Sequence, residues 1–163
     1  MAKNKEEKTN VMRVLEQKKI AYTAHTYPHE EGMAVDGVTV AKSMGFDPAI
    51  VFKTLVARGA SKQYYVFDVP VAENLDLKKA AKAVGEKSIE MIHQKELLPL
   101  TGYVHGGCSP VGMKKLFPTV FHSSAENLAA MIVSAGKIGY QVELAPRDLA
   151  ALVRAKFADI IAR

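Results

Sequence analysis

Hydrophobic residues recur along this chain with two different spacings, one typical of helices and one typical of strands. The alternation between the two predicts a series of short helices and strands. An apolar stripe at i, i+3 and i+4 predicts a first helix over about residues 4–19. Another helix is predicted between Asp76, a residue type that caps helix N-termini, and Gly85, which ends the pattern. The apolar stripe of that helix is expected to consist of Leu77, Ala80, Ala81 and Val84. Further helices are expected over residues 36–44 and 94–98 and from Pro146 onward.

Runs of β-branched and aromatic residues predict about seven short strands. A hairpin is expected between residues 50–56 and 63–69, with its turn at residues 59–62. The other strands are expected over residues 20–27, 88–91, 119–122, 129–134 and 140–144. Because hairpins and helical crossovers both connect these strands, we expect an α/β fold with a mixed sheet rather than a purely parallel one.

Composition adds that the chain is one ordinary globular domain over residues 1–163, with 48% hydrophobic and 24% charged residues. No apolar run approaches the roughly 18 residues that a membrane span needs. Residues 2–8 are charged and have no apolar core, so we do not expect a signal peptide. The single cysteine excludes an internal disulfide and a cysteine-based zinc site. These features predict a cytoplasmic protein without a membrane partner.

The net charge of +5 permits a polyanionic partner without requiring one. Lysines gather over residues 78–87, and Lys114-Lys115 directly follow a glycine-rich stretch. This clustering favours contact with a nucleic-acid backbone, although no nucleic-acid-binding signature accompanies it.

That glycine-rich stretch covers residues 101–115, with four glycines and a proline between Gly102 and Gly112. Such a composition is incompatible with a helix interior or a central strand and predicts a loop. Glycine backbones can approach a ligand closely and offer N–H groups to an anion or a developing oxyanion. A plain tight turn between strands is the alternative.

Lys53 is the strongest single indication of chemistry. It lies in the predicted strand over residues 50–56, where Val51 and Leu55 share its face and apolar residues line the other. A lysine is rarely buried without a partner, so this one either extends its amine to water at a sheet edge or forms a pocket floor. In a pocket it would bind a carboxylate, phosphate or carbonyl oxygen, or act as a base.

Other residues carry weaker indications. Ser134 ends a predicted strand and is followed by a glycine-containing turn, which places a hydroxyl and free N–H groups at a sheet rim, or forms an ordinary hairpin. Tyr27 ends another strand and either packs or offers its phenol to a pocket. Cys108 has His105 nearby but no triad context, so an inert thiol is favoured over a nucleophile. His25 and His29 with neighbouring glutamates form a weak metal candidate, and no metal site is predicted.

Three stretches together carry a family pattern. They are Lys53-Thr54 after an aromatic residue, the Gly-Tyr-x2-Gly-Gly-x-Ser-Pro-x-Gly motif that begins at Gly102, and residues 133–139. In these stretches the chain resembles the YbaK/EbsC family of bacterial Cys-tRNA(Pro) deacylases, which are related to the editing insertion domain of prolyl-tRNA synthetase. The resemblance extends from about Val11 to Ile160.

The resemblance implies a single domain with a mixed, mostly antiparallel and partly barrel-like sheet, flanked by helices. Its pocket would hold the 3′ end of a mischarged tRNA. The family's essential groups fall on Lys53, Gly106 and Ser134. The residues expected to bind substrate are Tyr27, Thr54, Gly107, Ser109, Pro110 and Gly136. No cofactor and no protein nucleophile are implied, because the substrate's own thiol attacks its ester and forms a cyclic thiolactone. Cys108 then occupies a variable position of the motif.

The sequence therefore predicts a trans-editing deacylase of Cys-tRNA(Pro), and of Cys-tRNA(Cys) as a second substrate. Its partners would be the acceptor end of tRNA(Pro) and, as an option, prolyl-tRNA synthetase. The segment 30–35 and positions Asp36 and Gln141 differ from some family members. Two alternatives therefore stay open: an Ala-tRNA(Pro) deacylase that uses water, and a tRNA- or synthetase-binding module without activity.

Overall fold

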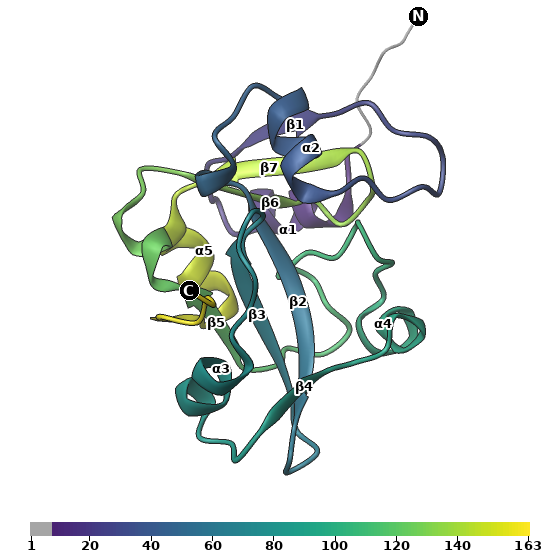
Figure 1. Cartoon of the computed structure of the whole chain (residues 1–163). Coiled ribbons are helices and arrows are strands. Elements are labelled where there is room, and N and C mark those ends of the chain that lie inside the picture. Colours follow the sequence, from purple (N-terminus) through teal and green to yellow (C-terminus); the bar gives the residue numbers. More distant parts are fainter. Residues whose placement is uncertain (1–7) are drawn as a thin grey trace, which may run out of the picture.

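A computed structural model describes residues 8–163, which form two β-sheets with helices packed around them (Figure 1). The smaller sheet has the strand order β1-β7-β6, and the larger has the order β4-β2-β3-β5-β8. The strands are β1 (Thr23–Thr26), β2 (Phe52–Gly59), β3 (Tyr64–Pro70), β4 (Ile89–Met91), β5 (Thr119–His122), β6 (Met131–Ser134), β7 (Tyr140–Leu144) and β8 (Lys156–Ala158). The helices are α1 (Asn10–Gln17), α2 (Gly37–Ser43), α3 (Leu77–Val84), α4 (Gln94–Thr101) and α5 (Pro146–Val153), with 3-10 turns η1 (Pro48–Ile50) and η2 (Ser123–Asn127).

The pairing of these strands confirms the expected α/β class with a mixed, mostly antiparallel arrangement. β2 pairs antiparallel with both β3 and β4, whereas β3–β5 and β5–β8 are parallel. A single parallel bridge between Val51 and Ile132 joins the larger sheet to the smaller one. The two sheets therefore meet at the start of β2.

Capping side chains explain where the helices begin. Asp76 accepts hydrogen bonds from the backbone N–H groups of Lys78 (2.9 Å) and Lys79 (3.0 Å) at the start of α3. Gly85 ends that helix in the left-handed conformation, with a φ of +76°. Thr9 caps α1 in the same way through the N–H of Met12. Local sequence therefore defines these helix ends before any tertiary contact is considered.

Separate apolar clusters pack against the smaller sheet and against the two sides of the larger sheet. α1 and α5 pack against β6 and β7 through residues such as Leu15, Leu149 and Met131, all fully buried. α3 packs against β2 and β3 through Ala80 and Ala81. The glycine-rich loop and α4 cover the other side of β2, where Cys108 and Phe117 contact Val56 and Val66.

Several sequence predictions need correction. The first helix begins at Asn10 rather than near residue 4, because Thr9 caps it, and positions 4–7 lie outside the described residues. Leu77 does not join the buried stripe of α3; it is 41% exposed in the first turn. α4 continues past the predicted residue 98 to Thr101 and contains Pro99. Strand β8 was not expected from the pattern; it pairs only with β5.

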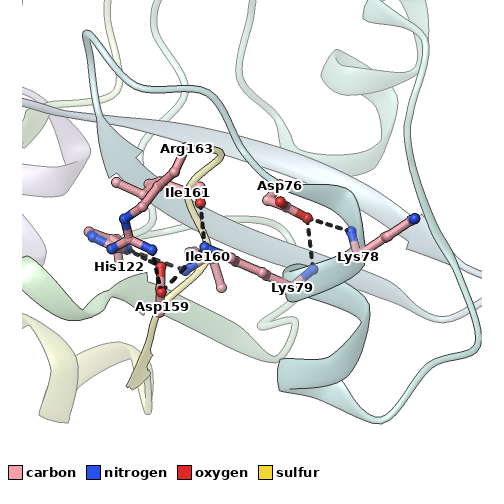
Figure 2. Close-up of polar contacts among 8 residues, drawn as sticks. All are labelled: Asp76, Lys78, Lys79, His122, Asp159, Ile160, Ile161 and Arg163. Carbon is pink, nitrogen blue, oxygen red and sulfur yellow. Dashed lines mark hydrogen bonds and ion pairs between the residues drawn. The ribbon is translucent and has the colours of Figure 1, made fainter.

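The segment after β8 is held against the core by polar contacts (Figure 2). Asp159 pairs with Lys79 of α3 (3.3 Å) and with Arg163 (2.6 Å). The buried His122 accepts a hydrogen bond at Nδ1 from the Ile160 N–H (3.3 Å). This segment therefore connects β5 to the helix on the larger sheet.

None of the helices within residues 8–163 combines the length and the apolar character needed to cross a membrane.

Candidate functional site

A cavity of about 310 Å³ opens where the two sheets meet, beside the first half of β2. Its lining comes from segments far apart in the chain: the end of β1, the start of α2, β2, the glycine-rich loop, and β6 with β7. Five of the predicted site residues line this cavity: Tyr27, Lys53, Thr54, Gly106 and Ser134. The fold thus brings together residues that the sequence separates by more than a hundred positions.

An unpaired strand edge explains why this cavity lies beside β2. On the side away from β3, β2 pairs with β4 only from Ala57 to Gly59. The bridge at Val51 occupies the other end, so no strand among the described residues pairs with this edge over residues 53–55. The carbonyl of Val56 points to this edge, because it accepts a hydrogen bond from the Ile92 N–H. Residues two apart in a strand direct their backbone groups to the same edge, so the N–H and C=O of Thr54 also point there. Side chains from both faces of β2 can therefore reach the cavity.

Lys53 brings a half-buried amine to this cavity. Burial lowers the pKa of Lys53, and the charge of Glu73 partly opposes this shift. No carboxylate lies within ion-pair distance of Lys53 in the part of the chain that the structure describes. Its three N–H donors are therefore available to an oxygen of a bound molecule.

Thr54, the next residue, contacts a buried acid. Its hydroxyl donates a 2.5 Å hydrogen bond to Oδ1 of Asp68, its cross-strand partner on β3. Asp68 has no exposed surface, and burial raises the pKa of its carboxyl to about 7 in spite of the hydrogen bond from Thr54. Sequence reasoning missed Asp68, although an aspartate within the apolar run of residues 64–69 was the available signal.

The glycine-rich loop forms a second wall at close range. Gly106 has a φ of +89°, and a Cβ there would lie 2.7 Å from the Cβ of Ala34 in the segment before α2. A Cβ on Gly107 would lie 3.1 Å from the backbone nitrogen of Ile138. Glycine at these two positions therefore lets three loops approach one another around the cavity.

Four predicted substrate-binding residues are not among those that line the cavity: Gly107, Ser109, Pro110 and Gly136. Ser109 is fully buried, and its hydroxyl accepts from the Val111 N–H (3.2 Å). The N–H of Gly136 donates to Ser134 Oγ (3.0 Å), which fixes the hydroxyl at the end of β6. In this structure these residues shape the loop and the turn.

Tyr27 and Gln141 contribute two further polar groups. Tyr27 is 5% exposed, and burial raises the pKa of its phenol. Gln141 on β7 lines the same cavity, and its buried Oε1 accepts no hydrogen bond from the described residues. An unpaired buried acceptor of this kind is suited to a donor from a bound molecule.

The Cys108 thiol lines the cavity but is unsuited to attack. Burial, with a smaller contribution from the charge of Asp68, raises its pKa to about 12, so the thiolate is scarce at neutral pH. His105 makes no hydrogen bond with it among the described contacts.

No group of three or more His, Cys, Asp or Glu side chains within residues 8–163 is arranged to hold a metal ion. His25, a metal candidate in the sequence, instead pairs through Nε2 with Glu143 across β1 and β7 (2.7 Å). The polar groups that line the cavity therefore include the Lys53 amine, the hydroxyls of Thr54, Ser134 and Tyr27, and the Gln141 amide.

This arrangement can be compared with known proteins. A family model described as the aminoacyl-tRNA editing domain matches residues 29–152, which is most of the chain and includes every residue of the cavity named above except Tyr27. The chain belongs to this family. Its YbaK/EbsC character, predicted from the motifs, is confirmed by a protein of Enterococcus faecalis (strain ATCC 700802 / V583) with 46% identity over 161 residues, covering 98% of both chains.

That relative of the editing domain carries the provisional name Cys-tRNA(Pro)/Cys-tRNA(Cys) deacylase EbsC. Among solved structures, a candidate trans-editing enzyme for prolyl-tRNA synthetase superposes with a TM-score of 0.79 at 24% identity, covering 94% of this chain and 95% of that one. The hypothetical protein APE2540 superposes with a TM-score of 0.82 at 19% identity, covering 93% and 99%. At these identities the two structures confirm the fold of the editing domain.

Proposed function

We propose that this editing domain is an aminoacyl-tRNA deacylase that removes cysteine from Cys-tRNA(Pro), with Cys-tRNA(Cys) as a second substrate. The observation that carries the proposal is a single cavity lined by Gly106, Ser134 and the half-buried Lys53, whose amine has no carboxylate within ion-pair distance among the described residues. Family membership and the name of the Enterococcus relative support the choice of substrate. The cavity volume of about 310 Å³ suits an aminoacyl group with its terminal nucleoside rather than a folded stem.

The chemistry available here is positioning and charge stabilisation. In the proposed reaction the substrate's thiol sulfur attacks its own ester carbonyl carbon, and the bond from that carbon to the ribose oxygen breaks. The thiol proton passes to the departing ribose oxygen, which leaves free tRNA and a cyclic thiolactone. Negative charge builds on the carbonyl oxygen as the sulfur adds, and the Lys53 ammonium with N–H groups of the Gly106 loop would stabilise it.

The test compares deacylation of four esters of tRNA(Pro): cysteinyl, S-methylcysteinyl, alanyl and seryl. Thiol-assisted cleavage predicts rapid loss of the cysteinyl ester alone, because S-methylation keeps the side chain but removes the nucleophile. Lys53→Ala should lower kcat/KM for the cysteinyl ester by about 100-fold or more, the usual effect of losing one oxyanion donor. Lys18→Ala, an exposed lysine at the end of α1, is the matched control and should leave the rate unchanged.

Other outcomes would redirect the assignment. Preferential loss of the alanyl ester, with S-methylcysteine also removed, would indicate a water-using deacylase. Binding of tRNA without loss of any ester would indicate a module that has no activity. Loss of the cysteinyl ester with Lys53→Ala fully active would contradict the role assigned to Lys53.

A further inference from the structure

Asp68 is a buried acid that the proposed chemistry does not use. It has no exposed surface, its Oδ2 accepts no hydrogen bond from the described residues, and no basic group within residues 8–163 pairs with it. Its one hydrogen bond comes from the Thr54 hydroxyl, which lines the cavity. An uncompensated buried carboxyl destabilises a fold, and groups of this kind concentrate at functional sites.

The hydrogen bond determines what Thr54 can offer to a ligand. A hydroxyl has one donor hydrogen and two lone pairs, and here the hydrogen is directed at Asp68 Oδ1. An ionised carboxylate can only accept, so Thr54 cannot reverse the bond while Asp68 is charged. Its oxygen then presents lone pairs to the cavity, on the same strand as the Lys53 amine, which is a donor. Consecutive residues thus offer groups of opposite hydrogen-bonding character.

We propose that Asp68 is a positioning residue that holds the Thr54 hydroxyl as a hydrogen-bond acceptor for a donor group of the bound aminoacyl ester. This inference rests on the proposed function, since it takes the ester as the ligand. An aminoacyl ester carries two donors near its carbonyl: the α-ammonium group and the ribose hydroxyl next to the ester. Either donor would complete the contact, and the experiment below separates them.

The charge state of Asp68 determines whether the Thr54 hydroxyl is held as an acceptor, because the groups around Asp68 do not change their own charge near neutral pH. The titratable group that faces it is the Cys108 thiol from the glycine-rich loop, whose pKa is raised to about 12. Its neighbours in the sheet, Thr54 on β2 and Phe121 on β5, do not ionise. When Asp68 gains a proton it can donate to Thr54, and the threonine hydroxyl is no longer held as an acceptor.

The experiment measures binding of a non-cleavable analogue, 3′-cysteinylamido-3′-deoxyadenosine, to the full chain by calorimetry. The variants are Asp68→Leu, which leaves no acceptor for the Thr54 hydroxyl, Thr54→Val, the double variant and Thr54→Ser. Each of the first two should weaken binding about tenfold, and the double variant should be no weaker than the weaker single one, because Asp68 acts through Thr54. Thr54→Ser should retain binding, and binding by wild type should decrease as pH falls below 7 while Asp68→Leu shows no such change.

Two controls isolate the hydroxyl. Thr119→Val removes a buried threonine hydroxyl that donates to the Phe117 carbonyl outside the cavity, and it should leave affinity unchanged. Analogues in which hydrogen replaces the α-amino group or the 2′-hydroxyl identify the donor, because the effect of Thr54→Val disappears for whichever analogue lacks it.

The outcomes separate this inference from the proposed function. Two results would overturn the role of Asp68 and leave the proposed function standing. In the first, wild type binds tightly and the losses of affinity in the two single variants multiply in the double variant. In the second, Thr54→Val weakens the binding of both donor-deficient analogues as much as that of the parent analogue. If the effects of the Asp68 and Thr54 substitutions on binding are non-additive but the protein cleaves no ester, the inference is supported and the proposed deacylase function is overturned. Absence of analogue binding by wild type overturns both.

Discussion

Lys53 and Thr54 are neighbours in the chain, yet their polar groups have different surroundings. The Lys53 amine is half-buried with only a distant carboxylate, whereas the Thr54 hydroxyl is committed to the fully buried Asp68. Both residues reach the same cavity because the edge of β2 is unpaired at this point. At the scale of single residues, the site therefore depends on two groups, the Lys53 amine and the Asp68 carboxyl, whose burial costs free energy.

The charge of Asp68 gives a testable effect on stability. Its folded pKa of about 7 lies above the ordinary value of 3.8, so the ionised form is disfavoured by folding and stability is lost as pH rises toward and past 7. Asp68→Asn keeps an acceptor for Thr54 and removes the charge. We expect its thermal stability relative to wild type to be higher at pH 8 than at pH 5, by on the order of 3 kcal/mol in the free energy of unfolding. Melting curves at both pH values test this, and a difference independent of pH would contradict it.

At the scale of elements, three loop segments approach one another around the cavity beside β2, and their approach depends on glycine. Gly106 is in the left-handed region, and Ala34 leaves no room for a side chain there. Gly85 at the end of α3 has a similar positive φ, but a Cβ there would meet nothing within 4 Å. Substitutions at these two glycines therefore distinguish the effect of backbone strain, present at both positions, from the effect of steric contact, present only at Gly106.

Gly106→Ala should reduce both stability and activity. The strain of a positive φ and the contact with Ala34 should together lower the free energy of unfolding by about 2 kcal/mol or more. The displaced loop should also lower kcat/KM on the cysteinyl ester at least tenfold. Gly85→Ala, measured in parallel by thermal unfolding and deacylation, should show only a smaller stability loss. Equal activity in the two variants would contradict the role of loop contact.

The elements themselves were largely predictable, because their signals are local. Asp76 and Gly85 define α3, and the hairpin of β2 and β3 follows from its apolar runs and turn. Strand β8 was not predictable, since its three residues become a strand only through parallel pairing with β5.

The residues of the site were predictable to a lesser degree. The motifs identified the stretches that surround the cavity, and Lys53, Thr54, Gly106, Ser134 and Tyr27 all line it. They did not distinguish the residues that line the cavity from those that do not, such as the fully buried Ser109. The buried state of Asp68 depends on the cover that the glycine-rich loop and β5 provide, which no local pattern encodes.

At the scale of the whole molecule, the segment after β8 links α3 and β5 through one acid and one imidazole. Asp159 connects α3 and Arg163, and its pKa is held at about 2, first by the hydrogen bond from Arg163. His122 on β5 receives the Ile160 N–H, and burial lowers the pKa of His122. Figure 2 shows that these contacts converge on a single stretch of chain.

Acid should loosen this segment. Because the folded pKa of His122 lies below the ordinary value of 6.5, its contribution to stability is present above pH 6.5 and is lost as pH falls below it, by at most about 1.4 kcal/mol per pH unit. Protonated Nδ1 also cannot accept from Ile160. We expect His122→Asn, whose Oδ1 can accept in its place, to show a shallower decline in melting temperature from pH 7 to pH 5. Parallel curves for the variant and wild type would contradict this account.

The bridge between Val51 and Ile132, together with the pairing of β1 with β7, has a consequence for synthesis on the ribosome. A nascent chain that has emerged through the glycine-rich loop already carries Lys53 and Thr54, but it lacks Ser134, Gln141 and the strands that hold them. Contacts between such distant segments form late and slowly, since a long loop must close first. An incomplete chain therefore lacks the part of the cavity wall that Ser134 and Gln141 provide, and the cavity is complete only once the last strands have paired.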